Sequence, residues 1–201
     1  MKPTNRYVDR VLTSNSFEEL HSRFKNYKRP SKEISESFAA MANLRKVCRV
    51  DDYTWLHIGD GPHFCTAAIF AFFSKSCNWS IDPKLDSASF YWWMGKFNVQ
   101  NCFPYGFKYE EFSKECSHFI EKEKIGITCI HAHVKLNEVD KHFPKWSYLY
   151  SNVCCFKDQQ TFSEEYMNQN NIQKLLEYDD YGILSEKRHI VIYQKEQYSN
   201  E

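Results

Sequence analysis

The sequence predicts an α/β protein with a mainly parallel sheet, an antiparallel C-terminal hairpin and helices on both faces. From residue 53 onward, strand-like apolar runs alternate with helix-like segments, which is typical of parallel strands joined by right-handed crossovers. The last two predicted strands are separated only by the polar turn "SEKR", which forces them to run antiparallel. The 201 residues are enough for one domain with a substantial core.

Residues 1–50 are expected to form a basic helical segment packed on a core domain of residues 51–201. This segment carries 11 Lys and Arg residues against 5 Asp and Glu, although the whole chain has no formal net charge. Two helices are predicted: "FEELHSRFKNYK", opened by the capping pattern that starts at Ser16, and "KEISESFAAMANLRKVC", which follows Pro30. A basic segment on an acidic body can guide a polyanion, of which nucleic acid is the usual one.

The remaining elements follow from the two hydrophobic periodicities. Strands are predicted in "YTWLHI", "NWSID", "NVQNCFPY", "IGITCIHAHV" and "WSYLYSNVCCF", and in a final pair, "DYGIL" and "HIVIYQK", which "IQKLLEY" precedes. Helices are predicted in "CTAAIFAFFSK", "PKLDSASFYWWMGKF", "KYEEFSKECSHFIEKEK" and "LNEVDKHF". No repeat or long linker separates a second domain.

Composition excludes several classes of protein. The first ten residues contain no apolar stretch, and the longest strongly apolar run, "AAIFAFF", has seven residues, too few to span a bilayer. We therefore expect a soluble, cytoplasmic protein that does not bind membranes. Eight cysteines are present without a C-x-x-C pair, so no metal site is expected.

The loop "GDG" after the first predicted strand of the core is the clearest candidate ligand site. Ligands of open parallel sheets bind beyond the carboxyl ends of the strands, and Gly59 and Gly61 allow a close backbone approach there. Asp82 ends the next strand, in a position that suits hydrogen bonds from ribose hydroxyls. The third glycine of a dinucleotide fingerprint is absent, and Asp60 would repel a phosphate. The loop therefore favours adenosine joined to a cation, such as S-adenosylmethionine.

The segments "HIGDG" and "SIDP" and the terminal hairpin resemble the class I S-adenosylmethionine-dependent methyltransferases over roughly residues 50–195. The resemblance implies a Rossmann-like methyltransferase fold that binds S-adenosylmethionine. It also implies that the cofactor-binding residues are Gly59, Asp60, Gly61 and Asp82. His63 departs from the small residue usual late in this loop.

Several methyl acceptors can be compared at the ends of the fourth and fifth core strands. Neither end has the D/N-P-P-Y/F site of amine methylation, and His131 stands where ribose methylation would have an aspartate. Cys154 and Cys155 keep methylation of cytosine carbon 5 open, since that reaction needs a thiolate. The partner Asp-Ala-Pro-Cys pattern is absent from the fourth strand, so a core thiol with an incidental neighbour is the favoured interpretation of this pair. Guanine N7 needs no base, because its lone pair carries no proton. Such an acceptor needs only positioning.

The chain as a whole most resembles a small, divergent RNA cap guanine-N7 methyltransferase of the nidovirus type. The resemblance implies capped RNA as partner and a host-cytoplasmic location. Aromatic residues that can stack on a base are Trp92, Trp93 and Tyr105. Candidates for phosphate contacts are Arg45, Lys46 and Arg49, with Arg23, Lys25, Lys28 and Arg29 further along the segment.

His133 and Asn152 are the predicted positioning residues of the acceptor pocket, and no catalytic base is predicted. His131 and His133 alternate along a strand, so only one of them is expected to face the site. Two alternatives stay open at this point. The acceptor can be another RNA base, a protein or a small molecule, or the chain can be a non-catalytic methyltransferase-like module that binds RNA or protein.

Overall fold

The computed structural model describes residues 5–25, 27–154 and 157–196. Within these residues, seven strands form one sheet of order β3-β2-β1-β4-β5-β7-β6. The strands are β1 (Thr54–Ile58), β2 (Asn78–Ile81), β3 (Cys102–Tyr105), β4 (Ile125–Ile130), β5 (Trp146–Asn152), β6 (Ile172–Asp179) and β7 (His189–Lys195). The first five run parallel, and β7 runs antiparallel to both of its neighbours. The mixed α/β fold predicted from the sequence is confirmed.

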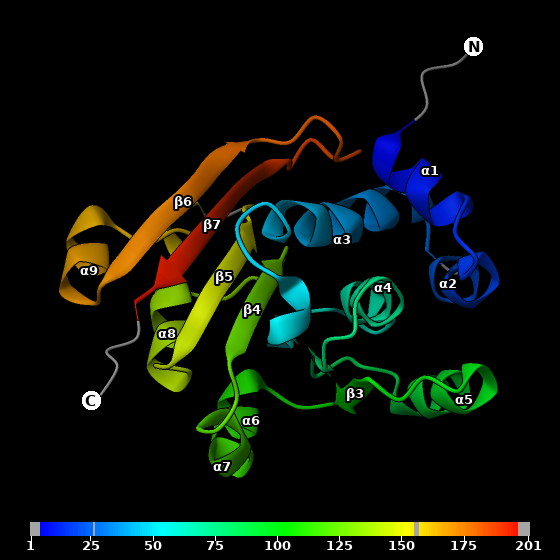
Figure 1. Cartoon of the computed structure of the whole chain (residues 1–201), viewed down its shortest axis with the longest axis horizontal. Coiled ribbons are helices and arrows are strands. Elements are labelled where there is room, and N and C mark those ends of the chain that lie inside the picture. Colours follow the sequence, from blue (N-terminus) through cyan, green and yellow to red (C-terminus); the bar gives the residue numbers. More distant parts are fainter. Residues whose placement is uncertain (1–4, 26, 155–156, 197–201) are drawn as a thin grey trace.

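Helices cover both faces of this sheet (Figure 1). They are α1 (Arg6–Leu12), α2 (Phe17–Phe24), α3 (Pro30–Leu44), α4 (Cys65–Phe73), α5 (Ser87–Phe97), α6 (Tyr109–Glu115), α7 (Ser117–Ile120), α8 (Leu136–His142) and α9 (Glu164–Gln169), with the short 3₁₀ turns η1 (Val50–Asp52) and η2 (Lys157–Gln159). Helices α1–α5 contribute to one apolar cluster and α6–α9 to the other. Alternate residues of β1 divide accordingly, since Trp55 packs in the first cluster and Leu56 in the second.

The N-terminal segment is part of the first apolar cluster. Leu20 and Phe24 of α2 and Phe38 of α3 are buried in it. Helix α1 was not predicted, and it is held by Tyr7, whose hydroxyl donates a 2.6 Å hydrogen bond to the buried carboxylate of Asp180. The domain boundary placed at residue 50 stays a prediction.

Three details of the sequence reading are wrong. The segment "KYEEFSKECSHFIEKEK" is not one helix, because Cys116 leaves the helical region with φ −104° and ψ 16° and separates α6 from α7. Ser16 precedes α2 but makes no side-chain cap. The penultimate strand is "IQKLLEYD" and not "DYGIL": Asp180 begins the β6–β7 connection, where its side chain binds the N-terminal helices.

Candidate functional site

The loop after β1 adopts the conformation for which its glycines are needed. Gly59 has φ +72° and Gly61 has φ +75°, both in the left-handed region. A Cβ on Gly59 would lie 2.6 Å from the Cβ of Ala132, whereas a Cβ on Gly61 would meet only the Tyr27 hydroxyl, at 3.8 Å. Gly59 therefore allows the turn after β4 to pack directly on the loop.

Asp82 ties this loop to the end of β2. Its Oδ2 accepts a hydrogen bond from the backbone N–H of Gly61 at 3.0 Å, and its Oδ1 accepts one from Lys84 at 2.7 Å. The carboxylate is only half-buried and lies on the wall of a cavity. It can therefore accept further hydrogen bonds from a ligand there.

Asp60 is bonded to the helix that follows the loop. Its Oδ1 accepts the N–H of Thr66 at 2.8 Å, and its Oδ2 accepts the N–H of Ala67 and the hydroxyl of Ser80, both at 3.0 Å. Burial raises the pKa of Asp60 to about 7, although these hydrogen bonds oppose the shift. The side chain thus caps the start of α4. Its contact with a bound cation stays a prediction.

Two cavities meet at the carboxyl ends of the strands. The larger, of about 530 Å³, is lined by Gly59, Asp82, Tyr109, Glu110, His131 and His133, among others. The smaller, of about 250 Å³, is lined by residues of the loop and by Tyr27, Lys32, Glu33 and Ser37 from the N-terminal segment. Gly59 and His131 line both cavities, so these two residues mark the junction.

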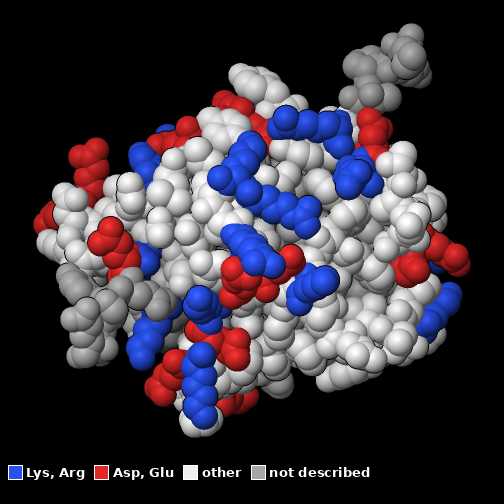
Figure 2. Space-filling model, in the orientation of Figure 1, with Lys and Arg blue, Asp and Glu red and all other residues white. Residues whose placement is uncertain are grey.

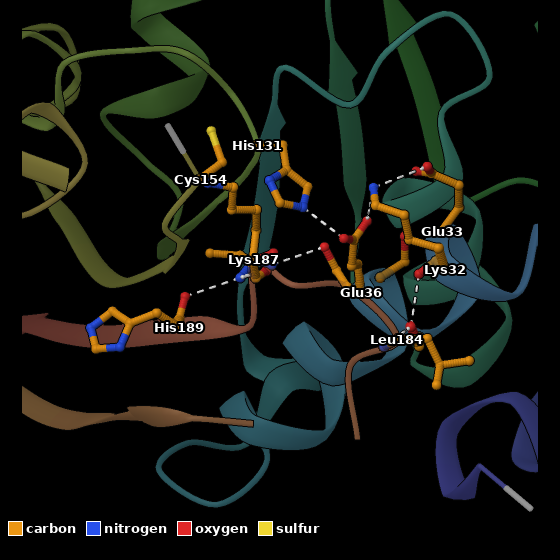
Figure 3. Close-up of polar contacts among 12 residues, drawn as sticks. Lys32, Glu33, Glu36, His131, Cys154, Leu184, Lys187 and His189 are labelled. Atoms are coloured by element: carbon orange, nitrogen blue, oxygen red, sulfur yellow. Dashed lines mark hydrogen bonds and ion pairs between the residues drawn. The ribbon is translucent and has the colours of Figure 1, made fainter. Parts of the chain in front are cut away.

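His131 is held at this junction by a buried carboxylate (Figure 3). Its Nε2 lies 2.7 Å from Oε1 of Glu36, which is 1% exposed, and Lys32 Nζ lies 2.9 Å from the second oxygen of Glu36. Burial lowers the pKa of His131, but the hydrogen bond and charge of Glu36 outweigh it, so the pKa is raised. Burial likewise opposes ionisation of Glu36, whereas His131 and Lys32 favour it, and its pKa is lowered.

Two acidic residues of the cavity walls were not singled out from the sequence. Burial raises the pKa of Glu33 in the smaller cavity, although Lys32 opposes this. Glu110, on the wall of the larger cavity, has a buried Oε2 with no hydrogen-bond partner among the described residues. An unpaired buried acceptor is costly, so this atom suits an N–H donor of a ligand.

The two predicted positioning residues lie in different surroundings. His133 is exposed and lines the larger cavity. Asn152 is fully buried at the end of β5, where its Nδ2 donates to the carbonyls of Lys187 and His189. The alternation argument for His131 and His133 is wrong, because β4 ends at Ile130 and His131 takes φ +50° in the turn beyond it.

The predicted stacking residues are not gathered at the cavities. Trp93 is completely buried among the rings of Phe64 and Phe90, so it presents no face to a base and its prediction is wrong. Trp92 is 55% exposed on α5, with the ammonium of Lys96 4.9 Å from the ring centroid. Tyr105 ends β3, where its hydroxyl donates to Glu115 at 2.8 Å.

Three of the predicted phosphate-binding residues, Arg45, Lys46 and Arg49, line neither cavity. Arg45 donates to the carbonyl of Phe73 at the far end of α4, and Arg49 pairs with Asp52 at 3.5 Å just before β1. Lys46 donates to the hydroxyl of Tyr178 on β6 at 2.8 Å. Figure 2 shows basic side chains over the C-terminal half of α3 and the segment after it. The structure therefore does not bring these cations together with the loop.

The two neighbouring cysteines can be followed only in part. Cys154 lies two residues beyond β5, and Cys155 lies outside the described residues. The described cysteines form no disulfide, and the described chain holds no cluster of three or more residues suited to a metal ion. None of its helices combines the length and the apolar character needed to cross a membrane.

Comparisons with known proteins identify the fold. No family model and no curated protein matches the sequence. Among solved structures, a mutant of MtNAS in complex with S-adenosylmethionine matches with a TM-score of 0.58 at 12% identity, over 94% of this chain and 70% of that chain. Magnesium protoporphyrin IX methyltransferase (ChlM) from Synechocystis PCC 6803 with bound SAM matches with a TM-score of 0.58 at 8% identity, over 98% of this chain and 100% of that chain.

The same ChlM with bound SAH matches with a TM-score of 0.59 at 8% identity, over 94% of this chain and 98% of that chain. The chain therefore has the Rossmann-like methyltransferase fold expected from the loop, the strand-end acid and the hairpin.

Proposed function

We propose that this protein is an S-adenosylmethionine-dependent methyltransferase. The observation that carries the proposal is the pair of cavities that join at Gly59, beside Asp82, at the carboxyl edge of a sheet with this fold. An edge of this kind is where open α/β sheets bind nucleotide-like ligands. Two structures with the same fold hold S-adenosylmethionine, and one holds SAH.

The larger cavity suits the adenosine part of the cofactor. Asp82 can accept hydrogen bonds from the ribose hydroxyls, because each of its oxygens has a lone pair beyond its bond to the backbone. Tyr109 offers a flat side chain for the base. Glu110 Oε2, which lacks a partner in the described structure, can accept from the exocyclic amine of adenine.

The smaller cavity suits the amino-acid part. Glu33 supplies a carboxylate for an ammonium group, and Lys32 supplies a cation for a carboxylate. The Asp60 side chain borders the same cavity and favours positive charge when ionised. The cofactor would thus span the junction and supply its electrophilic methyl group beside His131.

The proposed acceptor is guanine N7 of an RNA 5′ cap, in a small enzyme of the viral nidovirus type. Guanine N7 carries no proton, so holding it in line with the methyl group suffices. His133, which lines the larger cavity, remains the candidate for an acceptor contact. Capped RNA as partner and a cytoplasmic location remain predictions.

The test is methyl transfer from radiolabelled S-adenosylmethionine to three short RNAs: GpppA-capped, already N7-methylated, and uncapped. Label in the first RNA alone is the expected result. Label in all three would place the acceptor in the body of the RNA. If no RNA is labelled but calorimetry shows that the protein binds S-adenosylmethionine, the acceptor is a different molecule. If the protein does not bind S-adenosylmethionine at all, the enzyme proposal is overturned.

A further inference from the structure

Cys154 lies beyond the end of β5, where the side chain of Gln160 binds both its backbone and its sulfur. Its backbone N–H donates to Oε1 of Gln160 at 2.7 Å, and Nε2 of Gln160 donates to its sulfur at 3.4 Å. Gln160 is 2% exposed, and its own carbonyl accepts from the hydroxyl of Ser151 at 3.0 Å. The amide donor is therefore held against the sulfur, and a donor in this place favours the thiolate.

His131 faces the same thiol from the neighbouring turn after β4. Cys154 acts with Glu36 to raise the pKa of His131, and the effect of Glu36 is the larger. Figure 3 shows His131 between these two residues, with Glu36 reaching it from α3. The arrangement places a nucleophile beside a base and orients the base with a third group, as an activated thiol requires.

The other described cysteines are in different surroundings. Burial raises the pKa of each of their thiols: Cys48, Cys65, Cys77, Cys102, Cys116 and Cys129. No histidine contributes to the raised pKa of any of these six thiols. Cys154 is half-buried, as are Cys48, Cys77 and Cys116, so the residue is partly open to solvent. Cys154 thus combines polar activation with access.

We propose that Cys154 is a nucleophile for carbon 6 of a pyrimidine base in RNA, with His131 as its proton partner and Glu36 as the residue that positions His131. The site adjoins the junction of the two cavities, since His131 lines both of them. This inference rests on the proposed cofactor but not on the cap guanine. It adds a second class of acceptor, carbon 5 of a pyrimidine.

The proposed reaction balances without another reagent. His131 takes the thiol proton, the sulfur bonds to carbon 6, and the electron pair of the C5=C6 bond moves into the ring. Carbon 5 then bonds to the methyl group, while the methyl–sulfur bond breaks and its electron pair stays on the cofactor sulfur as SAH. Water takes the carbon 5 proton, the C5=C6 bond forms again, and the carbon 6–sulfur bond breaks to return the thiolate.

A 5-fluoropyrimidine tests this reaction, because fluorine cannot leave as the proton does and the adduct persists. The full chain is incubated with S-adenosylmethionine and an uncapped RNA that contains 5-fluorocytidine and 5-fluorouridine. We expect a protein–RNA adduct on a denaturing gel, with Cys154 as the modified residue by mass spectrometry. Cys154→Ser should abolish it, whereas the matched variant Cys116→Ser should keep it.

Alkylation by iodoacetamide tests the role of His131 and Glu36 separately. At neutral pH we expect Cys154 to react about tenfold faster than Cys48 and Cys116 of the same molecule. Glu36→Gln should slow the alkylation of Cys154 and leave that of Cys48 and Cys116 unchanged, because only Cys154 depends on the position of His131. A general loss of structure would instead expose all three thiols and speed their alkylation. The proposal is overturned by absence of the adduct, or by alkylation of Cys154 no faster than of the other two. Cofactor binding and cap methylation are measured independently, so their failure is distinguishable.

Discussion

Nε2 of His131 and Oε1 of Glu36 lie 2.7 Å apart, although 95 residues separate them in the sequence. The contact joins the turn after β4 to helix α3, so the N-terminal segment is part of the site as well as part of the core. The second oxygen of Glu36 is engaged by Lys32 at 2.9 Å. A single buried carboxylate thus binds both Lys32 and His131, two residues that line the smaller cavity.

The first prediction concerns Glu36→Gln, which should lower the free energy of unfolding by about 1–3 kcal/mol near pH 6. Because the pKa of His131 is raised, the pair stabilises the folded protein fully below pH 6.5, the ordinary pKa of histidine. This stabilisation is lost as the pH rises through the raised pKa. Because the pKa of Glu36 is lowered, its ionisation stabilises the folded protein fully above pH 4.5, the ordinary pKa of glutamate. This stabilisation is lost as the pH falls through the lowered pKa. Urea denaturation at several pH values measures the difference.

The difference between wild type and Glu36→Gln should therefore be largest at about pH 5–6.5 and should shrink at higher pH. Glu33→Gln is the matched control, because Glu33 lies on the same helix at 3.4 Å from the same lysine but does not contact His131. A loss for Glu36→Gln that is equal at pH 6 and pH 9 would contradict the role given to the His131 pair.

The second prediction compares alanine at the two loop glycines. Both positions have positive φ, which costs an L-residue roughly 1–2 kcal/mol. Gly59→Ala should cost about 1–3 kcal/mol more than Gly61→Ala, because its Cβ would overlap Ala132 at 2.6 Å. Thermal and urea unfolding of the two variants give this difference directly. Equal losses would show that the turn after β4 moves freely away from the loop.

The sequence predicts the order of the core elements because most of them bury a regular apolar face. The strands on either side of the loop and the helix between them lie where their patterns place them. Strand β6 was missed because it is an edge strand with charged residues, and only its pairing with β7 makes it a strand. Helix α1 was missed because the hydrogen bond that attaches it to the rest of the protein runs from Tyr7 to Asp180, a residue far along the chain.

The cofactor loop could be predicted because its glycines and the acid at the end of β2 come from consecutive elements. The rest of the site could not, since Glu36, His131 and Cys154 come from three distant segments. Their hydrogen bonds exist only after folding. The positive φ of His131 also breaks the two-residue alternation on which the sequence argument relied. Trp93 was predicted to stack on a base because the sequence does not distinguish an aromatic residue of the core from one of a binding site.

The third prediction concerns the pH dependence of cofactor binding. Burial raises the pKa of Asp60 to about 7, so its carboxylate is mostly protonated at pH 6 and mostly ionised at pH 8. A sulfonium in the adjoining cavity favours the ionised form, so affinity for S-adenosylmethionine should rise with pH by up to about tenfold over this range. Calorimetry in buffers of different ionisation enthalpy should detect a released proton.

SAH is the control ligand for this measurement, because it lacks the sulfonium charge and should show a smaller rise. Asp60→Asn should remove the dependence that comes from this residue. Glu33, whose pKa is also raised, lines the same cavity, and Glu33→Gln separates its share. Identical pH profiles for the two ligands in the wild-type protein would show that Asp60 does not sense the cofactor charge.

The last prediction is that Asp82→Ala lowers affinity for S-adenosylmethionine by about 100-fold, since hydrogen bonds to a charged group are worth about 1.5–3 kcal/mol. The variant also leaves the N–H of Gly61 without its partner, so some of the loss would come through the loop. Asp86→Ala is the matched control: Asp86 is exposed and caps α5 through the N–H of Ser89. Calorimetry gives both affinities, and urea denaturation reports any change in stability. Unchanged binding in Asp82→Ala would remove this carboxylate from the cofactor site. If RNA binding survived while cofactor binding was lost, the cofactor and RNA sites would be separable.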